Sequence, residues 1–144
     1  MTDHDRFPTH MDPSDAVMWD IEQDPVLRST ITAVAILDRP PDWDRLVARI
    51  DPAWRGGPPR WVVGPHWELD SHLRRVRAPG AGTLADVLAV AEPIAMDAFD
   101  RARPLWQFTL VEGLEDGQAA FVQKLHHSMT DGVGAIELAI LLVA

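Results

Sequence analysis

The pattern of apolar and polar positions predicts several β-strands. One shows a two-residue period, because Trp106, Phe108 and Leu110 alternate with Gln107 and Thr109, and Ser29–Leu37 is rich in β-branched and apolar residues. The clearest strand candidates are Ser29–Leu37, Leu105–Val111 and Ala119–His127. A turn-like segment, Gly113–Gly117, joins the last two candidates, so we expect them to pair as an antiparallel hairpin. Two shorter candidates are Arg60–Val63 and Leu73–Arg77. Arg55–Pro59 has the composition of a loop.

A helical period marks other segments. An apolar stripe follows Asp42, which is placed to cap the helix; it consists of Trp43, Leu46, Val47 and Ile50. Thr83 and Asp86 have the spacing of a capping box and predict the start of a second helix. Pro93 is expected to kink or end that helix.

The segment Gly132–Ala144 predicts a third helix, which is apolar on nearly every side and carries only Glu137 as a charged residue. Such a helix is expected to be buried. The sequence stops inside it, without a glycine cap or a polar exit. We therefore expect a continuation of the chain; the alternative is a final helix tucked into the core.

Composition narrows the classes of protein. The 144 residues suit one domain, and the formal net charge of -9 argues against a nucleic-acid surface. The chain has no cysteine, which excludes thiolate nucleophiles and cysteine metal sites. Met1–Asp20 lacks the apolar core of a signal peptide, and no stretch has transmembrane length. These features predict a cytoplasmic protein and allow peripheral contact with a membrane.

The most informative stretch runs from His126 to Gly132 and has the form HHxxxDG. It lies where the last predicted strand gives way to the last predicted helix. Strand alternation directs His126 and His127 to opposite faces, so they do not act as a matched pair. A histidine has the right basicity to take a proton from an alcohol at neutral pH. Asp131 is placed to fold back on the loop, and Gly132 permits close approach of other atoms.

Alternative chemistries fit this stretch less well. A metal site is disfavoured by the opposed histidines and the lack of further histidines nearby. A serine hydrolase is disfavoured because no G-x-S-x-G turn accompanies Ser128. For His126 a purely structural histidine remains the favoured interpretation, whereas the motif favours a functional His127.

The motif HHSMTDG resembles the active-site motif of the CoA-dependent acyltransferase superfamily, which includes chloramphenicol acetyltransferase and the condensation domains of peptide synthetases. Flanking segments are similar to the bacterial wax ester synthase/acyl-CoA:diacylglycerol acyltransferase family. They are Asp12–Ala16, Leu73–Val76, Phe99–Arg103 and Pro104-Leu105-Trp106.

The resemblance implies an α/β two-layer sandwich like one half of chloramphenicol acetyltransferase, with a mixed sheet and helices on one face. It implies that His127 is the general base, deprotonating diacylglycerol or a long-chain alcohol that attacks acyl-CoA without a covalent acyl-enzyme. Asp131 would hold the loop through an arginine, Gly132 would admit substrate, and His126 would support the site. Pro104, Leu105 and Trp106 would contribute to substrate binding, although Trp106 fits a core aromatic equally well. Acyl-CoA is a substrate, and no cofactor or metal is implied.

Family members have two similar domains with a channel between them, and residues 1–144 correspond to the first. We therefore expect the isolated chain to be nearly inactive and to need a C-terminal half as partner. One alternative is a condensation-like or polyketide-associated acyltransferase. An alternative of another class is a non-catalytic relic or lipid-associated interaction module, contacting membranes or lipid bodies through its apolar final helix.

Overall fold

The computed structural model describes residues 13–22, 24–50, 56–57, 62–63, 68–127 and 132–143. The helices are α1 (Pro13–Ile21), α2 (Trp43–Ile50), α3 (Leu84–Met96) and α4 (Gly132–Val143). The strands are β1 (Thr30–Leu37), β2 (Gly56–Gly57), β3 (Val62–Val63), β4 (Leu73–Arg77), β5 (Trp106–Glu112) and β6 (Ala119–His126). Short 3₁₀ turns lie at Pro25–Leu27, Leu69–Ser71 and Glu115–Gly117.

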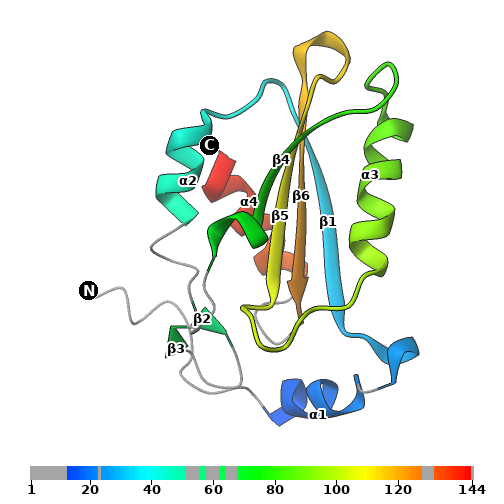
Figure 1. Cartoon of the computed structure of the whole chain (residues 1–144), viewed down its shortest axis with the longest axis vertical. Helices are drawn as coiled ribbons and strands as arrows, with labels where there is room; N and C mark the ends of the chain where they lie inside the picture. Colours follow the sequence, from blue (N-terminus) through cyan, green and yellow to red (C-terminus); the bar gives the residue numbers. More distant parts are fainter. Residues whose placement is uncertain are drawn as a thin grey trace.

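One mixed sheet has the strand order β1-β6-β5-β4 (Figure 1). The pairs β1–β6 and β6–β5 are antiparallel, and β5–β4 is parallel. Parallel neighbours need a crossover connection, which α3 supplies here. The predicted hairpin is confirmed as β5 and β6, and the predicted α/β class with a mixed sheet is confirmed with it.

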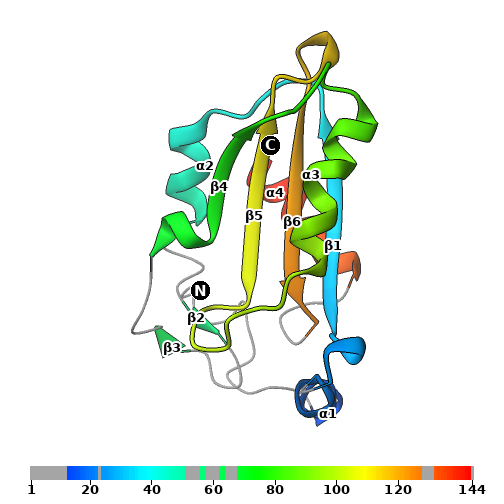
Figure 2. The ribbon, with the colours of Figure 1, turned by 45° about the vertical axis from the view of Figure 1, so that its right-hand side comes forward.

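Both faces of the sheet are covered. Along β6, Phe121 and Leu125 belong to the core beneath α2 and α4, whereas Ala120 and Val122 belong to a second core beneath α3. Figure 2 shows α3 in front of the strands and α4 behind them. The expectation that the helices lie on one face is wrong in this respect. The physical reason is that every residue of β6 is buried, so the strand needs a cover on each side.

The predicted helix starts are confirmed. The Thr83 hydroxyl accepts a hydrogen bond from Asp86 N, and Asp86 in turn accepts one from Thr83 N, which closes the capping box. Asp42 Oδ1 accepts from Arg45 N at 2.9 Å and so caps α2. Pro93 does not end α3, which continues to Met96. Proline removes only its own N–H, so the next turn still forms, with Asp97 N donating to Pro93 O at 3.1 Å.

Two expectations about the remaining segments need correction. Part of the predicted loop Arg55–Pro59 pairs with the next segment, because β2 and β3 form a two-residue antiparallel ladder. The final helix is not buried on every side. Its small residues Ala135 and Ala139 let one face approach the sheet closely, while the other face stays open. The large exposed apolar residues of α4 are Val133, Ile136, Ile140 and Leu141, each 58–68% exposed.

Among the described helices, none combines the length and apolarity that crossing a bilayer would require. The described part of the chain also holds no cluster of three or more potential metal ligands.

Candidate active site

The HHxxxDG motif occupies the junction between β6 and α4. His126 is the last residue of β6, His127 follows it directly, and Gly132 is the first residue of α4. Ser128 to Asp131 lie outside the described residues, and so does the predicted role of Asp131 in holding the loop. The junction is at the end of the sheet where α1 also lies (Figure 1).

His126 is a buried histidine with a carboxylate partner. Its side chain is 2% exposed, and its Nε2 lies 2.6 Å from Glu22 Oε2, at the C-terminal end of α1. The indole of Trp19 meets the imidazole edge-on, with ring centroids 5.3 Å apart. The backbone N–H of His126 donates to the carbonyl of Leu105 at 3.0 Å. This residue is therefore fixed by backbone, carboxylate and aromatic contacts at once.

The pKa of His126 lies below its ordinary value because burial disfavours the charged imidazolium. The contact with Glu22 acts in the opposite direction, and the nearby Arg101 and His127 add to the lowering. Burial outweighs the carboxylate, so the imidazole of His126 is neutral at pH 7. The supporting role that the family resemblance implies for His126 stays a prediction.

His127 is in a more open position than its neighbour. It begins the turn after β6 and is only half-buried, and its backbone N–H donates to the carbonyl of Ser29 at 2.8 Å. The two adjacent histidines thus differ in access. Of the two residues, His127 is the more accessible to solvent.

Arg101 fastens α1 over this end of the sheet. Its guanidinium lies 4.2 Å from the centroid of the Trp19 ring and donates to the Trp19 carbonyl. It also lies 3.5 Å from Glu22 Oε2. Arg101 lies in a segment that resembles the family, whereas nothing in the sequence indicated a role for Trp19 or Glu22. No local signal marks these two, because their partners lie far away along the chain.

Lys124 packs on the same side of β6 as His126, under the segment that follows α3. Its ammonium group donates to the carbonyl of Asp97 and lies 4.7 Å from the centroid of the Phe99 ring. Burial lowers the pKa of Lys124, while Asp97 partly opposes that effect. The lysine therefore anchors the segment that leads to Pro104, Leu105 and Trp106.

The residues Pro104, Leu105 and Trp106 are all buried. Trp106 packs in the sheet core. The centroid of its ring lies 4.7 Å from that of Phe108 and 4.9 Å from that of His72. This supports the interpretation of Trp106 as a core aromatic. Of Pro104, Leu105 and Trp106, Leu105 is the residue that contacts the candidate site, because its carbonyl accepts a hydrogen bond from His126 N.

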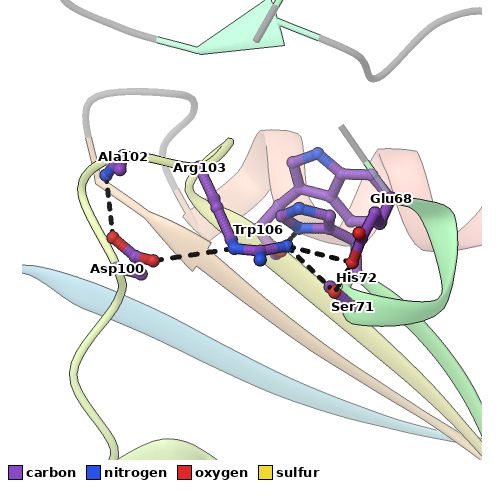
Figure 3. Close-up of polar contacts among 7 residues, drawn as sticks. All are labelled: Glu68, Ser71, His72, Asp100, Ala102, Arg103 and Trp106. Atoms are coloured by element: carbon purple, nitrogen blue, oxygen red, sulfur yellow. Dashed lines mark hydrogen bonds and ion pairs between the residues drawn. The ribbon is translucent and has the colours of Figure 1, made fainter. Parts of the chain in front are cut away.

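Figure 3 shows the polar cluster around Trp106. The Trp106 carbonyl lies 2.8 Å from His72 Nδ1, and burial lowers the pKa of His72. Above this pair, Arg103 Nη1 donates to Ser71 Oγ at 3.0 Å, and its Nε lies 3.6 Å from Asp100 Oδ2. The cluster ties the segment before β5 to the segment before β4.

A small cavity of about 50 Å³ opens beside the buried histidine. It is lined by Glu22, Arg28, Thr30, Ala98, Phe99, Arg101, Leu105 and His126. The volume is enough for one or two water molecules and far too small for an acyl chain.

The chain belongs to the wax ester synthase/diacylglycerol acyltransferase catalytic domain family, whose sequence profile matches residues 28–143. It is 42% identical over 148 residues to a protein of Mycobacterium tuberculosis strain H37Rv named a putative diacylglycerol O-acyltransferase, covering 92% of this chain and 30% of the relative. A second M. tuberculosis relative, named a probable diacylglycerol O-acyltransferase tgs2, is 39% identical over 79 residues, which are 55% of this chain and 17% of the relative.

Solved structures agree with the family. The wax ester synthase/diacylglycerol acyltransferase of Marinobacter aquaeolei VT8 superimposes with a TM-score of 0.70 at 27% identity, covering 91% of this chain and 37% of that one. The starter condensation domain of rhizomide synthetase RzmA gives a TM-score of 0.66 at 18% identity, over 91% of this chain and 36% of that domain, and so shares the fold. The predicted family is confirmed. The chain spans about a third of the length of these relatives.

Proposed function

We propose that this chain supplies the base-bearing domain of an O-acyltransferase that moves a fatty acyl group from acyl-CoA to diacylglycerol or a long-chain alcohol. The observation that carries the proposal is the contrast within the motif. The first histidine is enclosed and tied to a carboxylate, while the second, His127, stands half-buried at the end of β6. Family membership supports the same chemistry.

In the proposed reaction, His127 accepts the proton of the acceptor hydroxyl as the oxygen attacks the thioester carbonyl carbon. The tetrahedral intermediate then collapses, the C–S bond breaks, and the CoA thiolate takes the proton from the imidazolium. The base is regenerated and no acyl-enzyme forms, which is consistent with a chain that has no cysteine. Gly132, at the start of α4, would leave room for the substrate beside the base.

The oxyanion needs donors that face the base across a channel, and these often supply about 3 kcal/mol each to transition-state stabilisation. We assign them to a second domain, which the remaining length of the relatives would provide within the same polypeptide or as a partner chain. The lipid acceptors reside in membranes and lipid bodies. The proposal therefore includes peripheral contact of a cytoplasmic enzyme with those surfaces.

The test uses a chimera in which this chain replaces the aligned 148-residue segment of the M. tuberculosis relative. Purified chimera receives long-chain acyl-CoA with diacylglycerol or hexadecanol, and released CoA and lipid product are measured. The chimera should form product, and His127→Ala should reduce kcat by about 10²–10⁴-fold, the usual contribution of a general base. The matched control is His72→Ala, which removes a buried histidine of the structural cluster. Activity that survives His127→Ala would contradict the mechanism.

A further inference from the structure

Glu22 is a buried carboxylate at the centre of this end of the molecule. Its side chain is 8% exposed, and burying a carboxylate is costly unless donors surround it. Three groups approach it: His126 Nε2 at 2.6 Å, Arg101 Nη2 at 3.5 Å, and the backbone N–H of Ser29, which donates to Oε1. A carboxylate with this set of donors holds each of them in a fixed direction.

The first consequence concerns the proton on His126. A neutral imidazole has a single N–H, and the partner of one ring nitrogen decides which nitrogen carries it. A carboxylate can only accept, so Glu22 selects the form of His126 with hydrogen on Nε2, and Nδ1 is left as an acceptor. In catalytic triads a buried carboxylate orients an imidazole in the same manner.

The second consequence concerns the backbone of His127. Ser29 donates its N–H to Glu22 and accepts the N–H of His127 with its carbonyl at 2.8 Å. A single residue therefore connects the carboxylate to the residue that bears the proposed base. Thr30, next along β1, is the strand partner of His126. Glu22 therefore constrains this junction in two ways. It contacts the side chain of His126, and it binds Ser29, whose carbonyl accepts the backbone N–H of His127.

We infer that Glu22 is a positioning residue for His127. By accepting from His126 and Ser29 together, it sets the place and direction of the base without contacting substrate. This inference rests on the proposed acyl transfer. Groups that hold and orient a functional side chain often change activity about 10–100-fold when they are removed.

The structural arm of the test uses the whole 144-residue chain and needs no activity. Long-range ¹H–¹⁵N NMR reports which nitrogen of His126 carries hydrogen, and amide exchange reports the protection of Ser29 and His127. We expect the Nε2–H form in the wild-type chain. His126 and Ser29 face different oxygens of Glu22, and in Glu22→Gln one of these becomes an NH₂ group that donates and cannot accept, so the Nε2–H preference or the Ser29 protection should fall. A wild-type chain with hydrogen on Nδ1 would overturn the inference.

The kinetic arm uses the chimera described above. Glu22→Gln keeps the size of the side chain and should lower kcat about 10–100-fold, with KM unchanged within about twofold, because the base is displaced and substrate contacts are kept. Asp20→Asn is the matched control, since it makes the same chemical change at an exposed position of α1 and should leave kcat unchanged. Circular dichroism of each variant shows whether it is folded.

The outcomes separate this inference from the proposed function. If His127→Ala abolishes transfer while folded Glu22→Gln keeps kcat within twofold, the positioning role is overturned and the acyltransferase mechanism stands. If His127→Ala itself keeps full activity, both fall together. A loss of kcat in Glu22→Gln equal to that in Asp20→Asn would also overturn the inference, because a general change in charge would then explain it.

Discussion

The two ends of the sheet are held together in different ways. Where β5 turns into β6, the contacts run between backbones, and Glu115 N donates to Gly82 O at 3.1 Å (top of Figure 1). At the opposite end of the sheet, next to α1, side chains form contacts between segments that are far apart in the sequence (Figure 1). There Glu22 meets His126, and the Arg28 guanidinium donates to the last turn of α3 at 2.8 Å.

This difference distinguishes the hairpin end, which has a structural role, from the end that carries the candidate site. Backbone contacts at the hairpin end leave no charged group buried, and they depend on glycines that no other residue replaces easily. The opposite end buries an imidazole, a carboxylate and the ammonium group of Lys124, each of which is costly to remove from water. Buried titratable groups of this kind mark a candidate functional site, and this end carries the HHxxxDG motif.

The largest expected effect is at the hairpin end. Gly82 has φ +77°, and a Cβ there would lie 2.5 Å from Gly113 O and 2.7 Å from Leu114 Cα. Gly82→Ala combines an unfavourable backbone conformation with a clash against backbone atoms. We expect it to lower the free energy of unfolding by about 3 kcal/mol, measured by urea denaturation.

Gly117→Ala is the matched control for that substitution. Gly117 has a similar φ of +70°, but a Cβ there would meet nothing within 4 Å. Only the conformational cost remains, so the loss should be about 1 kcal/mol. Equal losses in the two variants would show that the close backbone approach at the hairpin end contributes nothing.

The two ends should also respond differently to acid. Burial lowers the pKa of both His126 and His72 below 6.5, so the unfolded chain binds protons that the folded chain does not. Stability should therefore be full above pH 6.5 and fall as the pH drops below it, by at most about 1.4 kcal/mol per pH unit for each group. Hydrogen bonds from Thr83 lower the pKa of Asp86, so the capping box at the hairpin end persists until the pH falls below 3.8.

Urea denaturation between pH 7.5 and 4.5 tests this contrast. The free energy of unfolding should fall less steeply with decreasing pH in His126→Gln, because this variant keeps only His72 of the two histidines. It should fall as in the wild-type chain in Asp86→Asn, because Asp86 titrates at lower pH. If this fall disappeared in Asp86→Asn, the acid response would come from the hairpin end of the sheet and not from the histidines.

The sequence predicted the scaffold better than the site. Local signals located β1, β5 and β6 to within one residue: β-branched and apolar content for β1, alternation for β5, and the Gly113–Gly117 turn for the start of β6. The Thr83–Asp86 spacing located the start of α3. The motif also located the candidate base. The sequence could not show that α3 and α4 cover opposite faces, since strand alternation is masked when both faces are apolar.

Glu22 shows why the rest of the site was missed. It follows α1 with nothing in its neighbours to distinguish it from other acidic residues of a chain with 22 of them. Its role depends on β6 passing beneath α1, and that is a property of the tertiary fold. Trp106 is the opposite case. The family resemblance suggested a role for it in substrate binding, but its packing on Phe108 and His72 places it in the core.

The smallest expected effect concerns the two arginines that lie over tryptophan rings. Arg101 lies 4.2 Å from the centroid of the Trp19 ring and also binds the Trp19 carbonyl, whereas Arg75 lies 5.4 Å from the Trp43 centroid, with a half-exposed side chain. Arg101→Ala should reduce the free energy of unfolding by about 1 kcal/mol and speed amide exchange in α1, because the helix loses its fastening to the sheet. Arg75→Ala should leave the unfolding free energy within experimental error, since solvent screens its pair with Glu112. If both variants lost the same stability, or α1 kept its protection in Arg101→Ala, side-chain contacts would not be what holds α1 over the histidines.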